Sequence, residues 1–242
     1  MDFELSVVGM VINVMPIGEA DKRITILTGE MGKISAFVKG ARRPQSQFLA
    51  STNPFVYGRF ELYQGRNSFT VKKVTVANYF RELAKDYEAS CYGFYFLEVA
   101  QYFSVEGVEA SESIELLYMS LKALTSRKFD YSFIKAIFQL KTLMISGTYP
   151  DFFSCKGCKR NDELIGVSFY DNALYCDKCA PSDISYLDTS TVYALQYIMS
   201  TPVKKIFSFK VSSKVLDELV KVSRTFFDKF AMHSFKSEEF LK

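Results

Sequence analysis

The sequence predicts an α+β fold: an N-terminal β-barrel of five strands, followed by an all-α helical domain that contains an inserted four-cysteine module. Three observations lead to this prediction. The first 80 residues alternate between apolar and polar positions and are punctuated by turn signals. After residue 80 the apolar residues recur at helical spacing. Between residues 151 and 180, four cysteines form two closely matched pairs.

The five strands are expected at residues 5–15, 23–28, 33–39, 55–63 and 68–76. Glycine and proline separate them, as in Gly29-Glu30-Met31-Gly32, and one longer loop runs from residue 40 to 54. No helical period interrupts the series. Closing the sheet would remove exposed edges, and the OB-fold is the commonest barrel of five strands. We therefore expect an OB-fold domain over residues 1–80.

Helices are expected over residues 82–103, after Ser111, after Asp130, over 189–199 and over 213–230. We assign residues 81–150 and 181–242 to one helical domain and residues 151–180 to a module inserted in it. The many Phe and Tyr residues of these helices are interpreted as core, because aromatic side chains commonly dominate buried area.

The cysteine module has the spacing C-x2-C-x17-C-x2-C, formed by Cys155, Cys158, Cys176 and Cys179. This spacing is typical of a four-thiolate zinc site, and four thiolates leave no open position for a reacting water. We therefore expect one structural zinc ion. Two disulfides or a redox C-x-x-C are the alternatives; a reducing compartment disfavours the first and the matched pairs disfavour the second. Cys91 lies in a predicted helix and is interpreted as a small buried residue.

No catalytic residues are predicted. The sequence has no phosphate-binding glycine loop, so no nucleotide cofactor is expected, and its single histidine, His233, accompanies no nucleophile motif. A metallohydrolase is a further alternative, and it would need a zinc site with an open position for water. The N-terminus lacks a signal-peptide pattern, and no stretch reaches the roughly 20 apolar residues of a membrane helix. We expect no membrane association and a cytoplasmic, nucleoid-associated location.

Positive charge is concentrated in the first third of the chain. Residues 1–80 hold ten Lys/Arg and six Asp/Glu, whereas residues 81–150 hold seven and nine. No acidic residue occurs from Gly32 to Gly58, a stretch that contains Lys33, Lys39, Arg42 and Arg43. Such a surplus favours contact with a polyanion, and a merely solvated basic face is the alternative.

Three segments resemble the bacterial RecO family of DNA repair and recombination mediator proteins. "GEADKRITILTGEMGKISAFVKGARRP" (residues 18–44) is similar to the family's N-terminal signature. "GTYPDFFSCKGC" with "LYCDKC" is similar to its zinc module, and "FKSEEFL" (residues 235–241) to its C-terminal tail. After Pro44 the family often has further basic residues, whereas this chain has Gln45 and Gln47, so the positive cluster ends at Arg43.

The resemblance implies a non-catalytic protein of the RecF pathway of DNA recombination, acting on DNA damage. Such proteins bind single- and double-stranded DNA, anneal complementary strands and work with RecR. They help load the RecA recombinase onto DNA coated by single-stranded-DNA-binding protein, whose C-terminal tail docks on the helical part.

We expect the phosphate contacts to come from basic residues near the third strand, with strand lysines pointing outward and the arginines in the following loop. They are Lys33, Lys39, Arg42 and Arg43, together with Lys22 and Arg23. The alternative is a zinc-containing protein-interaction adaptor, whose barrel binds a protein instead of DNA.

Overall fold

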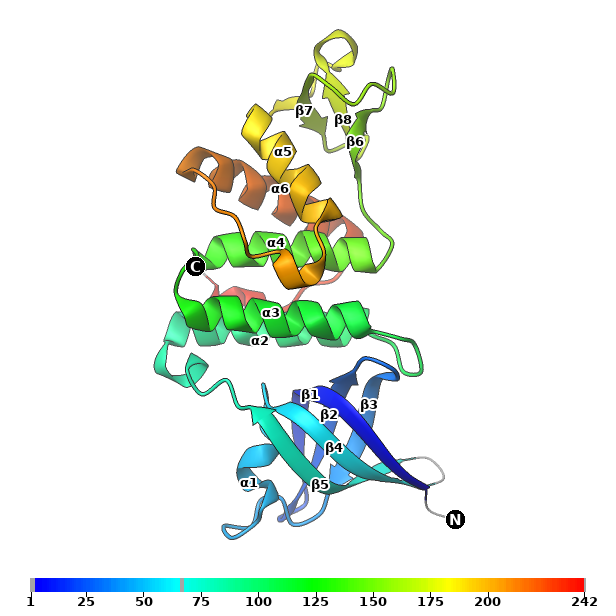
Figure 1. Cartoon of the computed structure of the whole chain (residues 1–242), viewed down its shortest axis with the longest axis vertical. Coiled ribbons are helices and arrows are strands. Elements are labelled where there is room, and N and C mark those ends of the chain that lie inside the picture. Colours follow the sequence, from blue (N-terminus) through cyan, green and yellow to red (C-terminus); the bar gives the residue numbers. More distant parts are fainter. Residues whose placement is uncertain (1–2, 66–67, 242) are drawn as a thin grey trace. The chain divides into compact units, whose positions relative to one another are not determined.

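The computed structural model describes residues 3–65 and 68–241 (Figure 1). The chain divides into two compact units, residues 1–125 with 235–242 and residues 126–234. The first unit therefore combines the barrel with the first two long helices. The predicted limits at residues 80, 150 and 180 do not follow this division, and they stay a prediction about which parts of the chain fold independently.

The first unit contains the predicted closed barrel, in the strand order β1-β2-β3-β5-β4 (Figure 1). β1 pairs with both β2 and β4, and a short parallel contact between β3 and β5 completes the closure. This arrangement confirms the five-stranded OB-fold. The strands are β1 (Phe3–Ile17), β2 (Asp21–Thr28), β3 (Gly32–Val38), β4 (Tyr57–Gln64) and β5 (Phe69–Asn78).

Alternation along β2 and β3 separates the barrel core from its outer surface. Successive side chains of a strand point to opposite faces, so apolar residues at every second position fill the interior. Ile24, Ile26, Ile34, Ala36 and Val38 are buried there, packed with side chains of the other three strands. The residues between them face outward, and this parity places Arg23 and Lys33 on the outside of the barrel, whereas Lys22 has the parity of the buried Ile24 and Ile26.

Three α-helices and two short 3-10 helices, labelled η, complete the first unit within the described residues. They are α1 (Phe48–Ser51), η1 (Leu83–Lys85), α2 (Tyr87–Phe103), α3 (Ser111–Ser126) and η4 (Lys236–Phe240). The helix expected from residue 82 is divided, because Asp86 adopts an extended conformation and caps α2 through the N–H of Ala89. The C-terminal segment is anchored on α2: Phe235 is buried against the rings of Tyr95 and Tyr102.

Gly32, at the start of β3, occupies a position that only glycine fits. Its φ of +61° is unfavourable for other residues, and an added Cβ would lie 2.6 Å from the carbonyl oxygen of Val108 and still closer to that of Val105. Gly18 has a similar φ of +51°, but a Cβ there would meet nothing within 4 Å. The pair therefore separates backbone strain from steric overlap.

Gly32→Ala is expected to lower the free energy of unfolding by roughly 3 kcal/mol or more, the sum of left-handed strain and overpacking. Gly18→Ala carries the strain alone and should cost about 1–2 kcal/mol. Urea unfolding of both variants measures the difference. Equal decreases in the free energy of unfolding would show that the segment containing Val105 and Val108 moves away from the new methyl group at no energetic cost.

The second unit contains the remaining helices and a small sheet. Helix α4 packs against α5 and α6, and the four-stranded sheet has the order β6-β8-β7-β9. β7 pairs antiparallel with β8 and forms a hairpin between the two cysteine pairs. The elements are α4 (Tyr131–Ile145), β6 (Asp151–Cys155), β7 (Leu164–Ser168), β8 (Ala173–Cys176), η2 (Asp177–Cys179), β9 (Ser185–Tyr186), α5 (Thr189–Ser200), η3 (Val203–Lys205) and α6 (Ser213–Ala231).

Within residues 3–65 and 68–241, no helix combines the length and hydrophobicity needed to cross a bilayer.

Candidate metal centre and nucleic-acid interface

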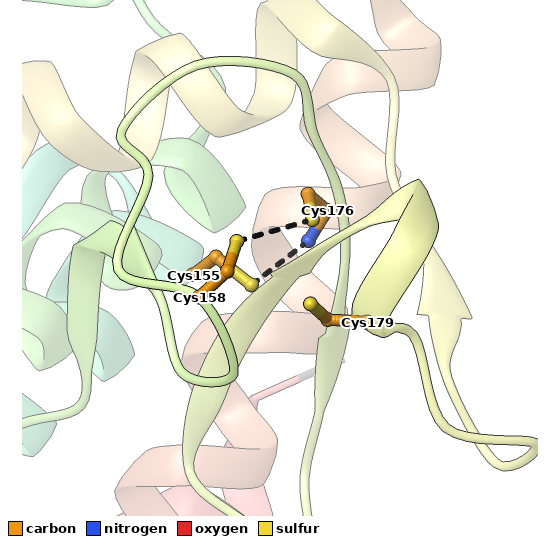
Figure 2. Close-up of side chains that lie close together, drawn as sticks. All are labelled: Cys155, Cys158, Cys176 and Cys179. Carbon is orange, nitrogen blue, oxygen red and sulfur yellow. Dashed lines mark hydrogen bonds between the residues drawn. The ribbon is translucent and has the colours of Figure 1, made fainter.

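The four cysteines of the module converge from separate elements, as Figure 2 shows. Cys155 ends β6, Cys158 lies in the turn after it, Cys176 ends β8 and Cys179 ends η2. Their Sγ atoms all lie within 4.8 Å of one another, and those of Cys158 and Cys176 are 3.7 Å apart. A tetrahedral zinc site with Zn–S bonds of about 2.3 Å has sulfurs about 3.8 Å apart. The donor set and its spacing fit zinc.

Backbone N–H groups stabilise negative charge on this cluster. Burial raises the pKa of the Cys155 thiol, but hydrogen bonds from the N–H groups of Cys158, Cys176 and Gly157 outweigh burial and lower this pKa to about 6. Gly157 is required for the close approach, since a Cβ there would lie 2.9 Å from the Sγ of Cys179. The turn thus holds its thiolate ready for a cation.

Cys179 shows the opposite effect, because it shares the cluster with three other sulfurs. Hydrogen bonds with Cys158 and Cys176, and burial after them, raise the pKa of the Cys179 thiol to about 12. A bound divalent cation favours the deprotonated thiolates, so binding it would release protons. Four thiolates would complete its coordination, which suits a structural ion better than a catalytic one.

Cys91 lies in α2, in the other unit, and is half-buried instead of buried as predicted. The reason is its position on a cavity of about 490 Å³ between β1, α2 and the C-terminal segment.

The outer surface of the barrel carries the second candidate site. Arg23 on β2 lies across from Met15 on β1 and Phe37 on β3, and all three side chains are exposed. Lys39 follows the end of β3, and Arg42 and Arg43 lie in the next turn, all exposed as well. The structure therefore brings four of the six predicted residues, Arg23, Lys39, Arg42 and Arg43, to one end of the barrel.

Two hydrogen bonds fix the loop that bears the arginines. Arg42 donates from Nη1 to the carbonyl oxygen of Gly18, at 2.9 Å, and the N–H of Gly40 donates to Oδ1 of Asp21, at 2.7 Å. The loop therefore lies against the turn between β1 and β2. That turn contains two acids, Glu19 and Asp21, and the Asp21 carboxylate contacts the backbone of the arginine loop.

The other two predicted residues have partners within the fold. Lys22 is only 8% exposed and donates to Oδ1 of Asn53 at 2.9 Å; burial, and then the charge of Arg42, lower the pKa of Lys22. Lys33 is half-buried and donates to the carbonyl oxygen of Gln101 in the last turn of α2, also at 2.9 Å. Lys22 ties down the loop after β3, and Lys33 joins β3 to α2.

Phe37 is a candidate that the sequence reasoning left unassigned. It is 36% exposed and lies beside Arg23, on the same face of the barrel as Lys39. The signal was available, because Phe37 has the same parity in its strand as the outward-pointing Lys33 and Lys39. An exposed ring between cations is the arrangement that unpaired bases stack on.

Comparison with known proteins covers nearly the whole chain. The family model "Recombination protein O N terminal" matches residues 1–80, and "Recombination protein O C terminal" matches residues 84–239. The curated protein "DNA repair protein RecO" of Acetivibrio thermocellus is 32% identical over 97% of this chain and 94% of its own length. Proteins of the same name are also similar to this chain. That of Alkaliphilus metalliredigens is 29% identical over 90% of each chain. That of Clostridium perfringens is 28% identical over 97% of this chain and 96% of its own length. The chain belongs to the RecO family of DNA repair proteins.

Proposed function

We propose that this chain is a non-catalytic DNA-binding protein of recombinational repair. It binds single- and double-stranded DNA without sequence preference and promotes the annealing of complementary strands. With RecR it helps load RecA onto DNA coated by single-stranded-DNA-binding protein, whose C-terminal tail docks on the helical part. Family membership supports the repair role, and the exposed basic end of the barrel around Phe37 is the observation that carries DNA binding.

The proposed contacts are to the phosphate backbone. Arg23, Lys39, Arg42 and Arg43 present their charges to solvent, where they can replace condensed counterions on DNA of any sequence. Phosphate contacts position a strand without reading its bases, which suits a protein that must act at any damaged site. Lys22 and Lys33 support this surface through their bonds to the loop and to α2, and we assign them a smaller share of the binding.

The proposed cofactor is one structural zinc ion on Cys155, Cys158, Cys176 and Cys179. Its support is the convergence of four sulfurs within 4.8 Å of one another, with backbone N–H groups directed at one of them.

The direct test measures binding and annealing with purified protein. Fluorescence anisotropy with labelled single strands and duplexes at physiological salt should show binding of both, weakening as salt rises. Complementary strands mixed with the protein should pair faster than the strands alone. Failure to bind either DNA, with RecR still bound, would favour the adaptor function instead.

Phe37→Ala is expected to weaken single-strand binding by roughly 5- to 160-fold, since stacking of one base on an aromatic ring contributes about 1–3 kcal/mol. Duplex binding should change much less, because paired bases are not free to stack. Tyr170→Ala is the matched control: it removes an exposed ring from the zinc module. Equal effects on single strands and duplexes would argue against stacking at Phe37.

A further inference from the structure

The second unit carries a concentration of positive charge that lies outside the barrel. Residues 126–150 and 189–216 together contain eight Lys/Arg and one Asp/Glu, a net charge of +7, whereas the whole chain has +3. Charge counted over long consecutive blocks of the chain does not reveal this surplus. The zinc module separates the two segments, and both border on acidic stretches. The barrel is therefore one of two basic regions.

Ring contacts place the two segments side by side. The ring centroids of Phe129, just before α4, and Phe207 lie 6.0 Å apart, and those of Phe133 of α4 and Phe209 lie 5.3 Å apart. The row continues onto α5, where Tyr197 lies 4.8 Å from Phe209. A hydrogen bond of 2.9 Å between Tyr197 Oη and Ser208 Oγ adds to this contact. The basic residues next to these aromatics consequently belong to segments that lie side by side in the fold.

Some of the cations in these segments are engaged by the fold. Lys141 is buried and donates to the carbonyl oxygen of Met199 at 3.1 Å. Lys214 pairs with Asp188 at 2.8 Å, and Glu218 of α6 is held by the N–H of Asp188 and by Thr191.

Both segments also carry basic side chains that are exposed, whereas Lys135 is half-buried. The exposed ones are Arg127, Lys128, Lys204, Lys205 and Lys210. Asp130 is the one acid of the two segments. At the end of the aromatic row, Tyr193 is 68% exposed and its ring lies 6.4 Å from that of Tyr197. We call Arg127, Lys128, Lys204, Lys205, Lys210 and Tyr193 the second basic surface.

We propose that the second basic surface binds a second single strand of nucleic acid, so that one chain holds two strands at once. The inference rests on the proposed function. Lysines provide contacts to phosphate, and the exposed tyrosine ring provides a stacking platform for an unpaired base. Annealing brings two like-charged strands together, and a separate cationic surface for each strand lowers their mutual repulsion. A single basic end on the barrel would leave the incoming strand without neutralisation.

The test compares two double variants of the full chain. Lys205→Ala/Lys210→Ala removes two charges from the second basic surface, and Lys221→Ala/Lys229→Ala removes two exposed charges from α6 in the same unit. Titration uses labelled oligothymidine of about 15 nucleotides, a length within the range that one barrel accommodates. Circular dichroism and zinc content verify that each variant is folded.

The wild type and the α6 control are expected to bind two strands per chain. In Lys205→Ala/Lys210→Ala the first strand should bind as before, and the second roughly 25-fold more weakly at about 0.1 M salt, from two lost contacts of ~0.7 each. Annealing of complementary strands should slow by about tenfold or more. Tyr193→Ala should weaken the second strand too, with duplex binding unchanged.

Two results would overturn this inference and leave the barrel's role intact: one strand per wild-type chain, or wild-type annealing by Lys205→Ala/Lys210→Ala. If that variant instead lost affinity for an acidic peptide such as oligoglutamate while still binding two strands, the surface would be assigned to an acidic protein. No strand binding by the wild type would refute the proposed function itself.

Discussion

Cys176→Ser is expected to abolish zinc binding and to unfold the module of residues 151–180. Cys176 is buried, its Sγ lies 3.7 Å from that of Cys158, and its N–H donates to the Sγ of Cys155. A serine hydroxyl cannot replace the thiolate as a ligand, and a structural zinc ion contributes on the order of 10 kcal/mol to the folding of a small module. Removing the metal from the wild type with a chelator should have the same effect.

Metal analysis should find one zinc ion per wild-type chain, and cobalt substitution should give the charge-transfer absorption of thiolate ligands. Hydrogen exchange should then show loss of protection in β6, β7 and β8 after chelation. Cys91→Ser is the control, since this thiol lies in the other unit and should leave the zinc content unchanged. Full protection of the module in metal-free protein would contradict a structural role for the ion.

The second large effect is expected from replacing Arg23, Lys39, Arg42 and Arg43 together with alanine. Each phosphate contact to a single strand contributes ~0.7 to the slope of log K against log salt, so the slope should flatten by roughly 2–3 units. At about 0.1 M salt this corresponds to a loss of roughly 10²–10³ in affinity. All four side chains are exposed, so apart from the loss of the hydrogen bond between Arg42 and Gly18 the variant should keep most of the wild-type resistance to urea.

Lys22→Ala/Lys33→Ala provides the contrast. Both lysines are held by the fold, through Asn53 and Gln101, so their loss should lower stability and leave the salt slope within about one unit of the wild type. A slope that flattens as much as in the fourfold variant would show that both lysines contact DNA. An unchanged slope in the fourfold variant would show that the basic end of the barrel is not the DNA site.

The features that the sequence predicts well are those set by local periodicity. Alternation with period two placed the strands and identified which side chains face outward, as the burial of Ile34 and Ala36 confirms. The C-x2-C pairs identified the four cysteines that converge, because a tight turn directs two thiolates at one point. The family signature extended this to a function. Each of these signals is contained in a short stretch of the chain.

Tertiary structure decided what depends on partners distant in the chain. Lys22 meets Asn53 across 31 positions and Lys33 meets Gln101 across 68, and neither pairing leaves a trace in the local pattern. The same holds for the hydrogen bond of Arg42 with Gly18 and for the contact of Phe129 with Phe207 next to the second basic surface. Charge and parity are local properties of the chain. Whether a cation is available to a ligand depends on how the barrel closes and how the helices pack, and only the folded chain determines that.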